Sequence, residues 1–483
     1  MLAIPYFSTC LLSLSMPKNQ YFSNIRKGIA HRIGSLSIAN SLLAELEQSS
    51  YTGIKAYDLH DWEKGKKSKT SFLDIVTNDY NQKIAGWIEL LNQEKDAFEL
   101  QPATKINISP KLNINAAVIK EWKQEEPTIE INIGLILAVE DLLGKCLCTK
   151  SFFTQRTPTG ELSIANPFFL IGPDHADRFL NYGSIVALGD AHAQLLTAGI
   201  PIAPWRLFQF DLIAELSAQW AMLHEQAHWM LGHIDYLAAQ RGDTSDFSLN
   251  ENGENTPLDD ATATKYFEMG ADALASSLLF HLNWDTERQE NKRFRDYRNK
   301  LQQAYGNIGS ESIIYLNDHA AILRTILLSI GLVVLLMENK RLYLNSPRSS
   351  YPLPVTRLLG IFLTVGEAYG DMINFSEDNT YDTEKIRPVI ISYIEVIVDL
   401  QLIVSLLKIN NPIFKPFIWE RNKEEEDQFT DDLFSILANG ASDPGIVQTE
   451  AAKEFIYLRS LDPAFMPRLK NYLHLGKSWL DNY

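Results

Sequence analysis

The chain has 483 residues, 46% of them hydrophobic and 22% charged, which is ordinary for a folded protein with two or three domains and an ample core. Its formal net charge of −16 argues against a general binder of nucleic acid or of anionic membranes. The three cysteines, Cys10, Cys146 and Cys148, lack the spacing of a disulfide framework or a zinc ribbon, so we expect a cytoplasmic protein.

Residues 1–180 predict a mixed α/β region. Helical patterning is found at 31–48 and 72–91, and strand-like, β-branched content at 105–109, 128–133 and 161–164. The first 17 residues carry no charged side chain, but they lack the basic start of a secretory signal, and Pro5 interrupts them early. We therefore expect no signal sequence.

Residues 211–236 contain no proline and one glycine, and their apolar residues recur at helical spacing, so we expect one long helix. This helix carries an H-E-x-x-H motif, from His224 to His228. Two histidines four residues apart differ by about 40° around a helix axis and can share a zinc ion. Glu225 is placed to act as a general base. An amphipathic helix with two incidental histidines is the alternative interpretation.

Zinc in a catalytic site needs a third protein ligand. On a continuous helix His233 points about 180° away from His224, and its spacing misses the metzincin pattern by one residue. Asp235 lies on the correct face, but roughly 10 Å beyond His228 along the axis. It is too distant unless the helix breaks at Gly232. We therefore expect His233 to be a helix-end residue rather than a ligand.

A second predicted helix follows the polar stretch 241–255, which has the composition of a surface loop. Thr256 and Pro257 suit the start of this helix. Glu268 and Asp272 lie four residues apart on one face, among apolar neighbours. Zinc would compensate the burial of Glu268, and the N–H of a ligand histidine that of Asp272. In the alternative interpretation both carboxylates point to solvent at a helix edge.

These motifs resemble the gluzincin metallopeptidases, and most closely the family of the CAAX prenyl endopeptidases and HtpX-type membrane proteases. That family has E-x-x-A-D on a second helix, here residues 268–272, a Gly-His pair, here 232–233, and an H-P-x-x-x-x-R segment, here 351–357 with tyrosine first. The resemblance implies one set of roles: His224, His228 and Glu268 as zinc ligands, Glu225 as base, Asp272 behind the ligands, and Arg357 as a structural or substrate-side group.

Tyr351 stands where the family has a histidine near the scissile carbonyl. A phenol can donate a hydrogen bond to an oxyanion, so Tyr351 is a candidate catalytic residue. It can equally be a packing tyrosine at the entrance of a helix.

A gluzincin site also needs a strand edge that pairs with extended substrate. Residues 161–170 are one candidate, which Pro167 weakens.

The apolar run 325–337 has 13 residues, too few to span a bilayer, and predicts a buried helix. The run 388–407 contains Glu395 and Asp399 and also predicts a core helix. We therefore expect no integral membrane segment. Helical patterning continues at 384–408, 425–438 and 450–461.

The sequence thus predicts a mainly α protein with a small β component (α+β). We expect a mixed α/β region at 1–180, a zincin-like metallopeptidase domain at 181–375 and a helical region at 376–483. The predicted function is selective, zinc-dependent endopeptidase action on a protein or peptide substrate. The alternatives are a metal-bound interaction or sensor module with an inactive or latent peptidase domain, and a metal-independent helical scaffold. The sequence carries no indication of the oligomeric state.

Overall fold

The computed structural model describes residues 72–94, 99–109, 111, 114–120, 125–147, 155–156, 162–163, 204–241, 247–250, 261–285, 290–291, 319–343, 351–372, 383–406, 431–432, 435–436, 447 and 449–475. The predicted helix at 31–48, the predicted helix start at 256–257, Cys10 and Cys148 lie outside these residues. The fold is mainly helical with a small sheet, as the sequence predicts.

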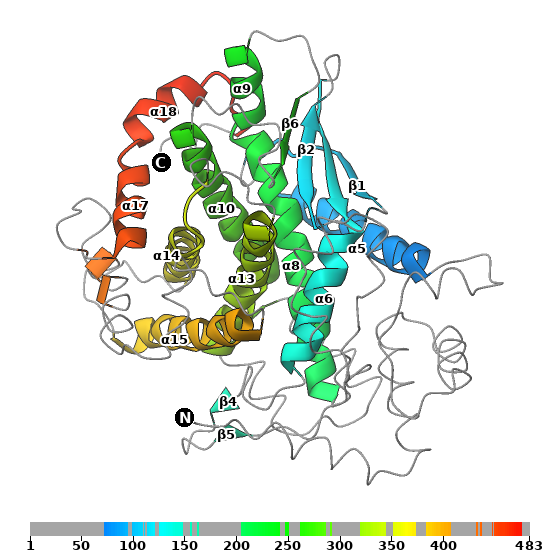
Figure 1. Ribbon diagram of the computed structural model, residues 1–483, viewed down its shortest axis with the longest axis vertical. Helices are drawn as coiled ribbons and strands as arrows, with labels where there is room; N and C mark the ends of the chain where they lie inside the picture. Colours follow the sequence, from blue (N-terminus) through cyan, green and yellow to red (C-terminus); the bar gives the residue numbers. More distant parts are fainter. Residues whose placement is uncertain are drawn as a thin grey trace.

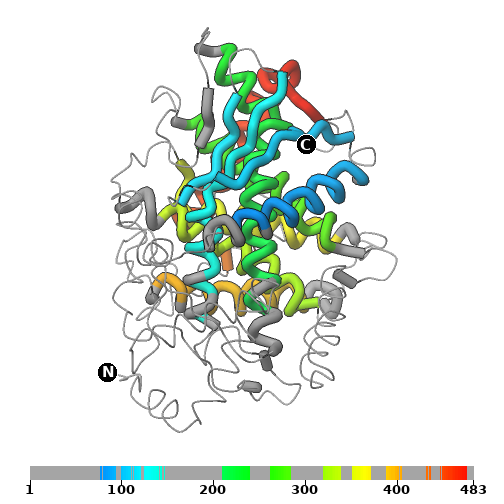
Figure 2. Tube along the Cα trace, turned by 90° about the vertical axis from the view of Figure 1, so that its right-hand side faces the viewer, coloured from blue at the N-terminus to red at the C-terminus, as the bar shows by residue number. Residues whose placement is uncertain are grey.

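The sheet has four strands in the order β1-β3-β2-β6. Strands β1 (Lys105–Ser109) and β3 (Thr128–Asn132) are parallel, whereas β2 (Ala116–Lys120) is antiparallel to β3 and to β6 (Phe247–Asn250). The β-branched residues Val118, Ile129 and Ile131 are fully buried, which explains why these segments pack as strands. Helix α5 (Phe72–Glu94) lies beside β1, and Figure 2 shows the sheet in front of the central helices.

The expectation of a surface loop at 241–255 is wrong for residues 247–250. They form β6, which pairs with β2 so that Val118 lies opposite Leu249. Backbone hydrogen bonds to β2 outweigh the polar composition of the segment. Of the candidate substrate strand at 161–170, the structure describes Leu162–Ser163 (β5), which pairs with Gln155–Arg156 (β4).

Helix α8 (Pro204–Met230) occupies the centre of the fold (Figure 1). It packs against the sheet and against α6 (Ile133–Leu147), α10 (Ala261–Asn283) and α13 (His319–Tyr343). Every residue from 216 to 230 is buried, so no face of this part of the helix meets solvent. A helix enclosed by neighbours on all sides can be apolar all round, and its polar residues need partners inside the protein.

Helix α8 ends six residues, or nearly two turns, earlier than the sequence predicts. Leu231 and Gly232 form a turn, with Gly232 at φ +68°, and α9 (His233–Arg241) then starts in a new direction. The backbone of Tyr472 lies where a Cβ on residue 232 would be, so the close approach of this segment also requires glycine. The predicted continuous helix 211–236 is therefore two helices.

The remaining helices are α14 (Pro354–Met372), α15 (Thr383–Leu406), α17 (Glu450–Arg459) and α18 (Asp462–Leu469). Helix α15 packs on α13, and α17 packs on α14 and α10. Buried residues from all three predicted regions belong to one apolar core.

Among the described helices, α13 alone is long and apolar enough to cross a membrane, over His319–Glu338 with a mean hydropathy of 2.4. All of this segment is buried inside the protein. Arg324 within it donates to Asp399 at 2.7 Å and to Glu395 at 3.0 Å, both on α15. In this structure α13 is a core helix whose buried charge is paired.

Candidate metal centre

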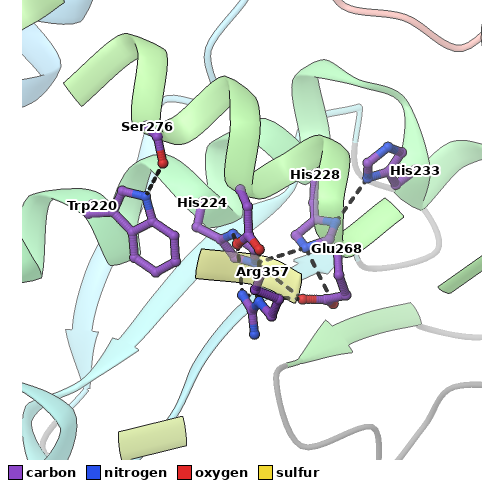
Figure 3. A network of polar contacts seen from close by, with 8 residues as sticks. Trp220, His224, His228, His233, Glu268, Ser276 and Arg357 are labelled. Atoms are coloured by element: carbon purple, nitrogen blue, oxygen red, sulfur yellow. Dashed lines mark hydrogen bonds and ion pairs between the residues drawn. The ribbon is translucent and has the colours of Figure 1, made fainter. Parts of the chain in front are cut away.

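Helices α8 and α10 bring His224, His228 and Glu268 together in a buried group that can hold a metal ion (Figure 3). The two histidine Nε2 atoms are 3.1 Å apart. The Glu268 carboxylate lies 3.5 Å from His224 Nε2 and 3.7 Å from His228 Nε2. Ligand atoms bound tetrahedrally to zinc at roughly 2.0–2.2 Å are separated by about 3.3–3.6 Å. The spacing of the three groups therefore fits one zinc ion.

The electrostatics of this group favour the protonation states that bind a metal. Burial lowers the pKa of His228 to about 3, so its imidazole is neutral. Burial by itself raises the pKa of Glu268, but His224, His228 and Arg357 outweigh this and hold the pKa below its usual value. Neutral imidazole and ionised carboxylate are the forms in which these side chains coordinate zinc.

Asp272, one turn after Glu268, lies behind His224. Its Oδ1 is 3.1 Å from His224 Nδ1. It also accepts two hydrogen bonds from Arg357 of α14, at 2.8 Å from Nε and 2.7 Å from Nη2. Burial raises the pKa of Asp272, but the Arg357 guanidinium more than offsets this and lowers it. A carboxylate here fixes the proton of His224 on Nδ1 and leaves Nε2 directed at the metal position.

Arg357 also reaches Glu268, because its Nη2 lies 3.7 Å from the Glu268 carboxylate. Two carboxylates and one guanidinium, none more than 3% exposed, therefore form one charged group. The group carries one more negative than positive charge. A bound divalent cation would balance this excess.

His233 has a role that the sequence did not reveal. Its Nδ1 lies 2.9 Å from His228 Nδ1, and its ring stacks on Phe267 at a centroid distance of 4.4 Å. Burial lowers the pKa of His233 well below its usual value, so the ring is neutral and can accept a hydrogen bond from His228. The break at Gly232 redirects the chain and allows this contact. In the sequence, Gly232 is the residue that could have indicated this break.

Gln226, inside the motif, binds the segment that leads into β1. Its amide donates to Ala103 O at 2.7 Å and accepts from Ala103 N at 2.8 Å, as a neighbouring strand would. Trp229 Nε1 donates to Gln101 O at 3.0 Å. The motif helix therefore carries the two histidines and also holds the segment that leads into edge strand β1.

The other predicted residues occupy defined places. Glu225 is 1% exposed on α8, between the two histidines. Asp235 binds Lys120 and His474, and so is engaged away from the metal group. Tyr351 is buried three residues before α14, where both its catalytic and its packing role stay predictions.

Comparison of the chain with protein-family models, with curated proteins and with solved structures finds no match. The site itself therefore carries the functional argument. It is a buried His-His-Glu group of the H-E-x-x-H type, assembled from two helices.

Proposed function

We propose that the chain is a zinc-dependent endopeptidase of the gluzincin type. The observation that carries this proposal is the convergence of His224, His228 and Glu268 at zinc-like spacing, with Glu225 on the same helix turn. A structural zinc site has no need of that glutamate, because it performs no proton transfer. Its presence beside the metal group favours hydrolysis over a purely structural role.

In this proposal each side chain has one task. His224, His228 and Glu268 hold the ion, which supplies Lewis-acid polarisation of the scissile carbonyl when bound. Glu225 accepts a proton from the attacking water and returns it to the leaving amine. Asp272 and His233 orient the two ligand histidines through their Nδ1 atoms. Tyr351 is the proposed hydrogen-bond donor to the developing oxyanion.

One observation favours the second candidate, a metal-bound sensor module or latent peptidase. His224, Glu225, His228 and Glu268 are each no more than 2% exposed. A peptide bond cannot reach a group this deeply buried without movement of the covering elements. The endopeptidase therefore requires an opening step, whereas a metal sensor does not.

The two candidates are separated by bound metal and cleavage in wild type and in Glu225→Gln. The endopeptidase predicts about one zinc per chain in both proteins, and cleavage of a complex protein mixture by wild type alone. Zinc in both without cleavage by either, across activating conditions, favours the sensor module. Absence of metal from wild type contradicts both. Glu450→Gln is the matched control, because the Glu450 side chain is 85% exposed on α17 and should leave cleavage unchanged.

A further inference from the structure

A cavity of about 360 Å³ lies between α10, α14, α17 and α18, away from the proposed metal position. Met269, Gly270 and Ala273 of α10 line it. At about 100° per residue, these positions lie roughly 100–200° around the helix from Glu268. Helix α10 therefore presents one face to the metal group and another to the cavity, which makes the cavity a separate site.

The walls of the cavity are mainly apolar. They include side chains from α14, α17, α18 and the turn after α8: Leu231, Leu363, Phe455, Leu458, Met466 and Leu469. The volume lies within the usual range of small-molecule sites and equals that of roughly a dozen water molecules. Water in such a space finds few polar partners, so its replacement by an apolar ligand is favourable.

A few polar groups determine which ligand head the cavity accepts. Glu367, Asp462 and Arg459 line it, so carboxylates outnumber the single guanidinium. Arg459 lies 3.9 Å from Asp462, and its side chain is 46% exposed. Burial raises the pKa of Asp462, although Arg459 and Tyr266 oppose this, so added negative charge is disfavoured here. A neutral or cationic head fits better than an anionic one.

The cavity also touches the elements that build the metal group. His233 lines it, and the same ring contacts His228 at 2.9 Å. Helix α14 contributes Leu363 to the wall and, six residues earlier, Arg357 to the metal group. A ligand between α10 and α14 would restrain both helices. Zinc then binds to a site that has already lost part of its freedom, which favours binding.

We propose that this cavity binds a small amphipathic molecule, with an alkyl body and a neutral or cationic head, and that its occupancy tightens zinc binding at His224, His228 and Glu268. The coupling half of this inference rests on the proposed zinc site, whereas the binding half does not. The cavity would thus be an effector site, separate from the place of hydrolysis.

The binding half is tested with octylamine, 1-octanol and octanoate, titrated calorimetrically into the full chain. Octylamine and 1-octanol should bind, and octylamine should bind about fivefold more tightly than octanoate, because one charge contact is worth roughly 1 kcal/mol. Glu367→Gln should weaken octylamine and leave 1-octanol unchanged. Failure of octylamine and 1-octanol to bind, or octanoate binding as tightly as octylamine, overturns the proposal.

Cavity-filling variants show whether the probes bind at this place. Ala273→Phe should abolish binding, whereas the same change at Ala464, which is exposed on α18 and does not line the cavity, should not. Met466→Trp fills the space from α18 and replaces Ala273→Phe where circular dichroism shows that variant to be unfolded. Undiminished binding to a folded filled variant contradicts the proposal.

The coupling half is tested by chelator competition for zinc, with and without saturating 1-octanol, which does not itself bind the ion appreciably. The zinc Kd should fall at least about fivefold in wild type and stay constant in the filled variant. A constant or raised Kd in wild type overturns the coupling and leaves the proposed function intact. No zinc uptake under any condition contradicts the proposed function and the coupling together, and the calorimetric titrations then decide the cavity alone.

Discussion

At the scale of single residues, the metal centre contains three buried charged side chains that must compensate one another. Glu268, Asp272 and Arg357 are nearly inaccessible to water, and each depends on the others for compensation. Removal of one member leaves another buried and uncompensated, which costs far more than the pair contributes. This asymmetry allows the role of Asp272 in orienting His224 to be separated from its role in stability.

Asp272→Asn should lower the free energy of unfolding by about 3–5 kcal/mol, because Arg357 then lacks its bidentate partner. Zinc affinity should fall by about 10–100-fold, because His224 Nδ1 loses a charged acceptor. Urea unfolding of the zinc-free protein and chelator competition measure the two effects. In the double variant Asp272→Leu/Arg357→Met, stability should recover only in part, because Glu268 then lacks the guanidinium beside it, while zinc affinity stays low. Recovery of both quantities would show that Asp272 does not act on the ligand.

The ligand assignment rests on a comparison between Glu268 and His233. Glu268→Ala should weaken zinc binding far more than His233→Ala, since only Glu268 directs an atom at the metal position. Loss of His233 should cost about tenfold, the effect of removing a partner behind a ligand. The reverse order would exchange their roles. Equilibrium dialysis with a chelator buffer gives both values.

Helical spacing placed His224 beside His228 and Glu268 beside Asp272, whereas Arg357 was added only by the resemblance of the motifs to a known family. Sequence reasoning did not predict the His228–His233 contact, because it assumed a continuous helix, on which His233 points away from His224. Gly232 indicates a possible break, but the contact of this turn with Tyr472, 240 residues later, is not encoded in the local sequence.

At the scale of elements, the break between α8 and α9 is the feature on which the site depends. Gly232 adopts φ +68°, a left-handed conformation that costs other residues about 1–2 kcal/mol. The backbone of Tyr472 occupies the place of a Cβ at residue 232. Any side chain here is therefore opposed both by backbone conformation and by contact.

Gly232→Ala should lower the free energy of unfolding by at least about 2 kcal/mol and reduce zinc affinity, because His233 moves relative to His228. Gly86→Ala is the matched control. Gly86 lies on helix α5 with nothing within 4 Å of its position for a Cβ, so the change should stabilise the protein by about 0.5–1 kcal/mol. Chemical denaturation of both variants measures this, and equal effects would show that the turn at Gly232 tolerates a side chain.

The strands show where local patterns suffice and where they do not. The β1 segment has alternating apolar residues and was predicted with its observed bounds. Strand β6 was missed because its apolar–polar alternation, from Phe247 to Asn250, covers only four residues inside the longer polar stretch 241–255, and its pairing with β2 makes it a strand. Long-range pairing of this kind is not present in a local window of sequence.

At the scale of the whole molecule, buried histidines couple stability to pH. His228 has a pKa lowered by burial to about 3 in the folded chain, against about 6.5 in the unfolded chain. Between these values the unfolded state binds a proton that the folded state does not, so acid favours unfolding. His233, whose pKa is lowered for the same reason, acts in the same direction.

The zinc-free protein should therefore lose about 1.4 kcal/mol per pH unit for each of these histidines as pH falls from about 6 toward 5. Stability should be nearly constant from pH 7 to 8 as far as these groups are concerned. Urea unfolding at each pH measures the slope. His228→Gln should reduce the slope, and an unchanged slope would show that His228 does not contribute.

Residues 472–475 are synthesised late, after the proposed zinc ligands that they help to position. His474 N donates to Met230 O, and His474 O accepts from Gln101 N, so this short segment joins the end of the motif helix to the entrance of β1. A ribosome makes residues 472–475 about 200 residues after Glu268, which is roughly 10–40 s later at 5–20 residues per second. The nascent chain thus contains every proposed zinc ligand well before the turn at Gly232 has its partner. Zinc captured during synthesis would bind an incomplete site, and the complete one forms only after residue 475 has left the ribosome.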